Sequence, residues 1–326
     1  MRAMKIKPIL SLFAAAALAG CSTAPKVSAP EVSGPKTLKV LMIGNSFAVC
    51  VLKHMPQCAK DAGVGLDLVS LYIGGCSLER HWGNVAKAET DREFAPYAVT
   101  WNYSSLEDQK AVPFAGLLRK MEPSGLKGYA NIPEMLKADK WDVVTIQQAS
   151  HFSWDPVTYE PFATRLVAKI RELAPQAEIV VQETWSYCTA DKRIFQDGGP
   201  GSWGFDQKGM YDRLSSAYAD LAKKNGFRRI PTGTAVQNYR AAVDVTDPHN
   251  DVVGNFWKDK DGKDKVDSIH LNPSGEYLQA LTWLDTLFGV DARNVRYAPK
   301  GLDPKRAETI RRAAAEASEK YRRAAR

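Results

Sequence analysis

Three side chains in this sequence have the types and the order that nucleophilic ester chemistry requires. Ser46 follows Gly44-Asn45 directly after a short apolar run, so we expect its hydroxyl at a tight strand-to-helix turn. The first N–H groups of the helix would lie beside it and could stabilise an oxyanion. Near the other end of the chain, Asp267 stands three residues before His270. A carboxylate at this spacing can hold one imidazole nitrogen while the other nitrogen takes the serine proton.

Each of these features also has a simpler explanation. Ser46 alone is most often the N-cap of a helix, and an Asp–His pair alone is often part of a surface loop. The chain order and the positions of the three residues together favour the chemical interpretation. No group of Cys and His residues has the spacing of zinc ligands, so we expect no metal and no organic cofactor. The alternating Lys and Asp residues at 258–265 lack the glutamate that completes a calcium loop, which favours a solvated loop.

Short apolar strands alternate with helices along most of the chain. Strands are predicted at 38–43, 66–72, 142–148, 178–182 and 229–231. Helices are predicted at 47–62, 159–173, 207–225, 234–242, 273–287 and 304–326. The segment 83–131 is predicted to be irregular, with aromatic stretches such as 97–103. This alternation predicts an α/β fold, a single-domain three-layer α/β/α sandwich with a mostly parallel sheet.

Four short clusters of polar residues or glycines follow the predicted strands. They are Gly44-Asn45-Ser46, Gly74-Gly75, Gln147-Gln148 and Glu183-Thr184-Trp185. Ligands bind to such sheets beyond the carboxyl ends of the strands. We therefore expect the four clusters to converge at one edge of the sheet.

Six ordered segments resemble the SGNH/GDSL hydrolases, and most closely their bacterial DUF4886 branch. The segments are LMIGNSF (41–47), LYIGGCSLERHW (71–82), WDVVTIQQASHFS (141–153), QETWSY (182–187), GTAVQN (233–238) and DSIHLNPSGEYLQALTW (267–283). The resemblance covers roughly residues 37–290. It implies an SGNH-hydrolase-like domain of flavodoxin-like topology, which we place at 37–299, and the activity of a serine esterase of the SGNH type.

The resemblance also implies catalytic roles, position by position. Ser46 would be the nucleophile, His270 the general base and Asp267 the residue that orients the base. Asn45 stands where the family usually has an aspartate. It keeps a side-chain acceptor for the amides of the turn but has no charge.

In the same way, the resemblance implies an oxyanion hole with three donors. The N–H of Ser46 and the N–H of Gly75 match two of them, with Gly74 as the alternative glycine. The third donor is usually an asparagine, but Gln147-Gln148 stands at that place. A glutamine amide can donate the same hydrogen bond from a longer side chain. We expect Gln148 to do so, with Gln147 as the alternative.

Several aromatic residues follow the rim segments and are candidates for substrate binding. Trp82, Trp154 and Trp185 would offer faces on which sugar rings stack, although core packing explains each of them equally well. His151 and His81 are more simply explained as pocket-wall or structural histidines than as a second base. The substrate expected from the resemblance and these tryptophans is an O-acyl ester, in particular an O-acetyl group on a carbohydrate. The alternatives are an SGNH acyltransferase or lipid acylhydrolase, and a non-catalytic glycan-binding lipoprotein.

The N-terminus predicts the location of the protein. Residues 1–20 have a basic start and an apolar stretch, which is typical of a secretory signal. They end at Leu18-Ala19-Gly20-Cys21, which resembles a bacterial lipobox, so Cys21 is the expected lipid attachment site on a flexible tether, 21–36. The alternative is ordinary cleavage near Ala24 with loss of Cys21. Ser22 after the cysteine favours the outer membrane and periplasm over retention in the inner membrane.

Charge and cysteine content narrow the class of protein further. The net charge is +7, but the excess lies in 1–20 and in a basic C-terminal helix at 300–326, and the body is nearly neutral. A nucleic-acid-binding protein carries its positive charge on the folded body, so this class is excluded. Beyond Cys21 the chain has four cysteines, which could form two disulfides or remain buried thiols: Cys50, Cys58, Cys76 and Cys188.

Overall fold

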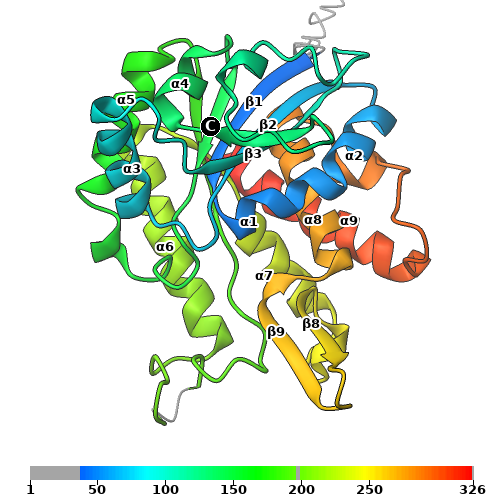
Figure 1. Ribbon diagram of the computed structural model, residues 1–326. Helices are drawn as coiled ribbons and strands as arrows, with labels where there is room; N and C mark the ends of the chain where they lie inside the picture. Colours follow the sequence, from blue (N-terminus) through cyan, green and yellow to red (C-terminus); the bar gives the residue numbers. More distant parts are fainter. Residues whose placement is uncertain (1–36, 196–198, 325–326) are drawn as a thin grey trace, which may run out of the picture. The chain divides into compact units, whose positions relative to one another are not determined.

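A seven-stranded sheet runs through the centre of the computed structural model, which describes residues 37–195 and 199–324 (Figure 1). Its strands lie in the order β4-β3-β2-β1-β5-β6-β7. Their bounds are β1 Thr37–Gly44, β2 Gly65–Tyr72, β3 Tyr97–Tyr103, β4 Lys127–Ala130, β5 Val143–Ile146, β6 Glu178–Gln182 and β7 Arg228–Ile230. The strands β2, β1, β5, β6 and β7 pair in parallel, whereas β3 and β4 add an antiparallel edge. In chain order the parallel strands lie 2-1-3-4-5, which is the flavodoxin-like order.

Helices cover both faces of the sheet. Their bounds are α1 Ser46–Val49, α2 Met55–Asp61, α3 Leu78–Thr90, α4 Ile132–Lys137, α5 Phe162–Leu173, α6 Gln207–Asn225, α7 Thr232–Ala242, α8 Pro273–Phe288 and α9 Pro304–Ala324. Helices α3, α4, α5 and α6 lie on one side, and α2, α8 and α9 on the other (Figure 1). The predicted three-layer sandwich with a mostly parallel sheet is therefore confirmed.

The segment 83–131 is not irregular as predicted. It contains most of α3, all of β3 and β4, and leads into α4. The buried residues of α3 are Leu78, His81, Val85 and Ala88, so a histidine interrupts its apolar stripe. The strand β3 has only three fully buried residues, because its outer pairing partner is a four-residue edge strand. Neither pattern is a continuous apolar run, which is why the sequence did not reveal these elements.

The helix predicted at 47–62 is broken. It comprises α1, a short 3₁₀ turn at Cys50–Lys53 and α2. Pro56 lies in the first turn of α2, where its missing N–H costs no hydrogen bond and where a new helix can begin.

A two-stranded hairpin lies outside the main sheet. It consists of β8, Val253–Lys258, and β9, Asp264–Leu271, and it extends away from the helices (Figure 1). The predicted solvated loop at 258–265 is the tip of this hairpin, where Lys258 and Asp264 form an exposed ion pair of 2.6 Å. The residues near the tip of both strands are mostly polar and exposed, so no apolar run marks these strands in the sequence.

The C-terminal helix α9 is an integral part of the folded unit. It packs on α7 and α8 through Ile310, Ala313, Ala314 and Ala317, which are spaced along one helix face and are buried. Its basic residues lie largely on the opposite, solvated face. Within the described ranges, no helix is both long and apolar enough to span a membrane. The signal peptide at 1–20 and the lipidated tether at 21–36 lie outside the described residues and stay predictions.

The four cysteines beyond the tether are free thiols. Cys58, Cys76 and Cys188 are buried and Cys50 is half-buried, with no disulfide among the described residues. Burial raises the pKa of Cys58 and of Cys76 to about 12, so both thiols are protonated at neutral pH.

Candidate active site

The four predicted clusters follow β1, β2, β5 and β6, which are neighbours in the sheet and end at the same edge. This edge includes the point between β1 and β5 where the strand order reverses, the usual ligand site of such sheets. Ser46 is the first residue of α1, and only Asn45 separates it from the end of β1. Gly44 allows this tight turn, because a Cβ at its position would lie 2.6 Å from the Cβ of Ala48. The sequence thus forces the serine onto the rim.

Ser46, His270 and Asp267 form a continuous series of hydrogen bonds. The Nε2 of His270 lies 2.8 Å from the Oγ of Ser46, and its Nδ1 lies 2.7 Å from Oδ2 of Asp267. The other carboxylate oxygen, Oδ1, accepts the backbone N–H groups of Ile269 and His270 at 3.2 Å each. The side chains of His270 and Asp267 are 35% and 32% exposed, so an external substrate can reach them.

Asn45 ties three rim segments together. Its Oδ1 accepts the N–H of Phe47 at 3.0 Å and the Nε2–H of Gln147 at 2.7 Å. Its Nδ2 donates to the carbonyl of Cys76 at 3.0 Å. A carboxylate could accept the first two bonds but could not donate the third. Asparagine at this position therefore gains a link to the loop after β2 in exchange for the charge.

The structure contradicts the expected role of Gln148. Its buried Oε1 accepts the N–H groups of Leu78 and Ala149, and its Nε2 donates to the carbonyl and hydroxyl oxygens of Thr158. With both ends of the amide engaged, Gln148 supports the start of α3 and has no donor left for an oxyanion. Gln147 is the member of the pair that reaches the turn of the nucleophile.

Unengaged backbone donors remain at the rim. Within residues 37–195 and 199–324, no group accepts a hydrogen bond from the N–H of Ser46, of Gly75 or of the alternative glycine, Gly74. Gly75 is exposed and has a φ of 59°, a left-handed conformation that favours glycine. These N–H groups are thus available to a ligand.

The segment after β6 holds the end of β9 that carries the histidine, a support that the sequence did not reveal. The indole Nε1 of Trp185 donates to the carbonyl of Ile269 at 2.9 Å. The N–H of Cys188 donates to the carbonyl of Ser268 at 3.0 Å, and the Ser268 hydroxyl donates to Asp191 at 2.7 Å. These three bonds fix the backbone between Asp267 and His270.

None of the three tryptophans considered as sugar platforms, Trp82, Trp154 and Trp185, is fully exposed at the rim. Trp185 is fully buried and stacks on Phe47, with ring centroids 4.1 Å apart, so it cannot contact a substrate. Trp154 is half-buried among Trp203 and Phe205. Trp82 is half-buried, with the guanidinium of Arg165 5.9 Å from its ring. Core packing therefore explains Trp185, and protein groups cover part of the other two rings.

A buried ion pair connects the base of the hairpin to the segment after β6. Arg240 on α7 pairs with Asp251 at 2.7 Å, and both side chains are almost fully buried. Arg240 also donates to the Ser186 hydroxyl at 2.8 Å. Asn272, the N-cap of α8, donates to the carbonyl of Asp251 at 2.8 Å. No motif in the sequence indicated this network, because its members are far apart along the chain.

The two remaining rim candidates, Glu183 and His151, are not part of the hydrogen-bonded series that contains Ser46. The carboxylate of Glu183 is buried, pairs with Arg229 at 3.1 Å and accepts the N–H of Thr234. His151 is half-buried beside Phe152, and burial lowers its pKa. Neither residue is hydrogen-bonded to Ser46 or His270 within the part of the chain that the structure describes.

His81 is not a second base. Its ring is buried under α3, with Nδ1 at 2.9 Å from the hydroxyl of Tyr97 and 3.5 Å from the sulfur of Cys76. Burial lowers the pKa of His81 to about 3, and the charge of Arg80 acts in the same direction. The ring is therefore neutral throughout the physiological pH range.

This burial predicts an acid-sensitive fold. In the unfolded chain His81 has its ordinary pKa of 6.5, whereas in the folded protein its pKa is about 3. The contribution of the neutral His81 to stability is thus fully present above the pKa of the unfolded chain, and it is lost as the pH falls below that value. We expect the free energy of unfolding to fall by about 2 kcal/mol between about pH 7 and about pH 5 from this residue alone. Urea unfolding of the parent and of His81→Gln tests this. The variant should lose that part of the pH dependence, and an identical dependence in both proteins would contradict it.

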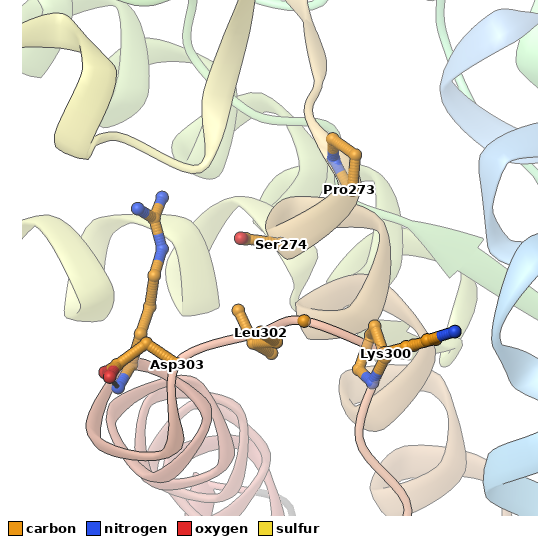
Figure 2. Close-up of a pocket in the computed structure, with 8 residues that line it drawn as sticks. Pro273, Ser274, Lys300, Leu302 and Asp303 are labelled. Atoms are coloured by element: carbon orange, nitrogen blue, oxygen red, sulfur yellow. Dashed lines mark hydrogen bonds between the residues drawn. The ribbon is translucent and has the colours of Figure 1, made fainter.

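Two pockets lie away from the rim. One, of about 340 Å³, lies between the start of α8 and the segment that leads to α9. Its lining includes Pro273, Ser274, Leu302 and Asp303 (Figure 2). A second, of about 730 Å³, lies at the amino ends of β1 and β2, opposite the carboxyl-end rim. Neither is lined by Ser46, Asp267 or His270.

Comparison with known proteins supports the family resemblance. The family model described as Domain of unknown function (DUF4886) matches residues 102–317, a range that includes Asp267 and His270 but begins after Ser46. A crystal structure of a DUF4886 family protein from Bacteroides uniformis ATCC 8492 is 28% identical, with a TM-score of 0.66, over 86% of this chain and 94% of that chain.

More distant structures share less with the chain. A protein described as a GDSL-like lipase from Parabacteroides merdae ATCC 43184 is 13% identical, with a TM-score of 0.44, over 79% of this chain and 99% of that chain. Phospholipase A1 from Streptomyces albidoflavus NA297 is 11% identical, with a TM-score of 0.36, over 76% of this chain and 98% of that chain. No curated protein matches the chain. On the family model and the Bacteroides uniformis structure together, this chain belongs to the DUF4886 family.

Proposed function

We propose that the protein is a serine carboxylic ester hydrolase. One observation carries the proposal: Ser46 Oγ lies 2.8 Å from His270 Nε2, while His270 Nδ1 lies 2.7 Å from Asp267. In this arrangement a serine hydroxyl can lose its proton to an imidazole whose other nitrogen is held by a carboxylate. A serine that only capped a helix would not require an oriented histidine at its hydroxyl.

The first half of the reaction forms an acyl-enzyme. The Oγ of Ser46 attacks the ester carbonyl carbon, and its proton passes to Nε2 of His270. Asp267 stabilises the imidazolium that results. The carbonyl oxygen becomes an oxyanion, which accepts hydrogen bonds from the unengaged N–H groups of Ser46 and Gly75. When the tetrahedral intermediate collapses, the C–O bond to the alcohol breaks and His270 gives its proton to the leaving alkoxide.

The second half releases the acid. A water molecule loses a proton to His270 and attacks the acyl carbon. The new oxyanion collapses with cleavage of the bond to Ser46 Oγ, which takes the proton back from His270. The products are an alcohol, a carboxylic acid and the unchanged enzyme, so no further reactant is required.

For the substrate we propose O-acyl esters, with O-acetyl groups on carbohydrate as the first class to test. The roughly one-third exposure of His270 and Asp267 supports a site that a bulky substrate can approach. A small acyl group would place the reacting carbon at Ser46 and leave the larger alcohol part on the surface of the rim.

The direct test is hydrolysis of 4-nitrophenyl acetate by the full chain, followed by rapid acid quenching and mass spectrometry. We expect turnover, and we expect the mass of one acetyl group on the peptide that contains Ser46. Turnover with the acetyl group on another residue would contradict the assigned nucleophile. An absence of both turnover and adduct, with this ester and with an acetylated-glycan panel, would contradict the hydrolase.

A further inference from the structure

The β8–β9 hairpin places an unusual tryptophan beside the residues of the proposed active site. Trp257 on β8 is 50% exposed, and it is the most exposed of the eight tryptophans in the chain. No other ring, cation or hydrogen-bond acceptor contacts its indole within 37–195 and 199–324. A large aromatic surface that neither packs in the core nor binds another part of the protein is typical of a contact surface for a ligand.

The register of the hairpin relates this ring to Asp267. Asn255 pairs with Asp267, and Trp257 pairs with Lys265, two residues nearer the tip. Side chains of residues that pair across the two strands lie on the same face of the hairpin. Side chains two residues apart on one strand also lie on the same face. Trp257 therefore lies on the same face of the hairpin as Asp267. Trp257 and Asp267 are thus diagonal neighbours across the ladder, a position at which residues are roughly 7–8 Å apart, about the width of a sugar ring.

The opposite face of the hairpin is different. It bears the pair of Phe256 and Val266, and the ring of Phe256 packs on His249 with centroids 4.5 Å apart. This face is therefore partly used for packing. Trp257 is on the face that remains open.

The neighbours of Trp257 on that face decide which ligand fits. They are Asn255, Lys265 and Asp267, an amide, an ammonium and a carboxylate. A fatty acyl chain binds by removal of its apolar surface from water, which requires an apolar environment around the chain. One indole ring with three polar neighbours is not such an environment. A pyranose ring has an apolar C–H face for the indole and hydroxyl groups at its edge for polar neighbours.

We propose that Trp257 is a stacking platform for a sugar ring of an O-acylated glycan, next to the ring that carries the ester. The proposal rests on the ester hydrolase function proposed above and specifies its substrate class. The hairpin then has two tasks, since its base holds Asp267 and His270 and its open face binds the glycan chain. Monosaccharide esters would not reach the platform, whereas oligosaccharide esters would.

Kinetics of Trp257→Ala test the platform. The substrates are 4-nitrophenyl acetate and a panel of O-acetylated xylo-, manno- and N-acetylglucosamine-containing oligosaccharides. We expect KM for the oligosaccharide that reacts best to rise about threefold to tenfold, with kcat nearly unchanged, because the contact is made equally in the ground state and in the transition state. With 4-nitrophenyl acetate the variant should match the parent. Trp257→Phe should restore most of the affinity.

A matched control uses the other face of the same strands. Val266→Ala removes an apolar side chain of similar exposure, 42%, and should leave KM for the oligosaccharide unchanged. An equal loss in Trp257→Ala with both kinds of substrate would mean that the hairpin merely positions Asp267, and would overturn the platform. An unchanged KM for the oligosaccharide would also overturn it.

Binding measurements separate failure of the platform from failure of the hydrolase. Calorimetric titration of the parent and of Trp257→Ala with the deacetylated oligosaccharides needs no turnover. Binding that depends on Trp257 without any ester hydrolysis would support the platform and contradict the hydrolase. Hydrolysis of small esters, with neither binding nor turnover of any oligosaccharide in the panel, would overturn the platform and leave the hydrolase standing.

Discussion

Esterase activity is expected to fall by on the order of a thousandfold or more when Ser46 is replaced with alanine. The variant loses the atom that forms the acyl-enzyme, so only direct attack by water remains. The fold should not change, because the only hydrogen bond that the Ser46 hydroxyl makes to a described residue is the one to His270. The measurement is kcat/KM with 4-nitrophenyl acetate.

A second serine provides the control for this variant. Ser124 lies on an exposed turn near the edge of the sheet, and Ser124→Ala should retain the activity of the parent. Thermal unfolding of both variants should match the parent within a few degrees. A Ser46→Ala protein that is folded and retains most of its activity would show that another residue is the nucleophile.

The second large effect is expected for Asp267→Asn, on the order of ten-thousandfold in kcat. The position of the new amide is determined by the backbone. Oδ1 accepts two N–H groups, from Ile269 and His270, so the amide oxygen must take that place. The NH2 group then points at Nδ1 of His270, which can only accept from it. The ring proton moves to Nε2, and the nitrogen that faces Ser46 can no longer accept the serine proton.

This argument predicts an order among variants. Asp267→Ala removes the carboxylate but imposes no tautomer, so it should lose less activity than Asp267→Asn. Asp264→Asn, at the exposed end of the same strand, makes the same charge change and should be nearly silent. Nitrogen NMR of His270 in the asparagine variant should find the proton on Nε2. An asparagine variant that is more active than the alanine variant would contradict the proposed role of Asp267.

The longer parallel strands were predictable because apolar residues dominate them and are mostly buried, whereas β7 is a three-residue strand with two arginines. All five lie within a few residues of their predicted bounds, and α6 begins and ends at its predicted residues. The antiparallel strands β3, β8 and β9 mix polar and apolar residues, and their pairing depends on partners elsewhere in the chain. Such strands have no local signature.

Those parts of the candidate site that directly follow a strand of the sheet were predictable from the sequence. Ser46 had to follow β1, and the three-residue spacing of Asp267 and His270, together with the family resemblance, indicated the other two residues. The choice between Gln147 and Gln148 was wrong, because adjacent residues beyond a strand end point in different directions and the sequence does not show which one turns inward. Burial of Trp185 was equally invisible, since a tryptophan after a strand has the same sequence context in a core and on a surface.

Trp257 was missed for a related reason. The alternating charges that follow it suggested a loop, and a residue in a loop has no predictable face. Only the pairing of Trp257 with Lys265 shows that it lies on the same side as Asp267. The supporting hydrogen bond from the Ser268 hydroxyl to Asp191 and the ion pair of Arg240 with Asp251 also join distant segments and have no local signal.

Labelling with a fluorophosphonate ester tests the central claim most directly, since it depends on an activated serine and not on the identity of the substrate. We predict one phosphonate per molecule, located at Ser46 by peptide mass spectrometry. His270→Ala should react far more slowly, and Ser46→Ala should not react. A folded parent protein that stays unlabelled, or that carries the label on another residue, would contradict the account.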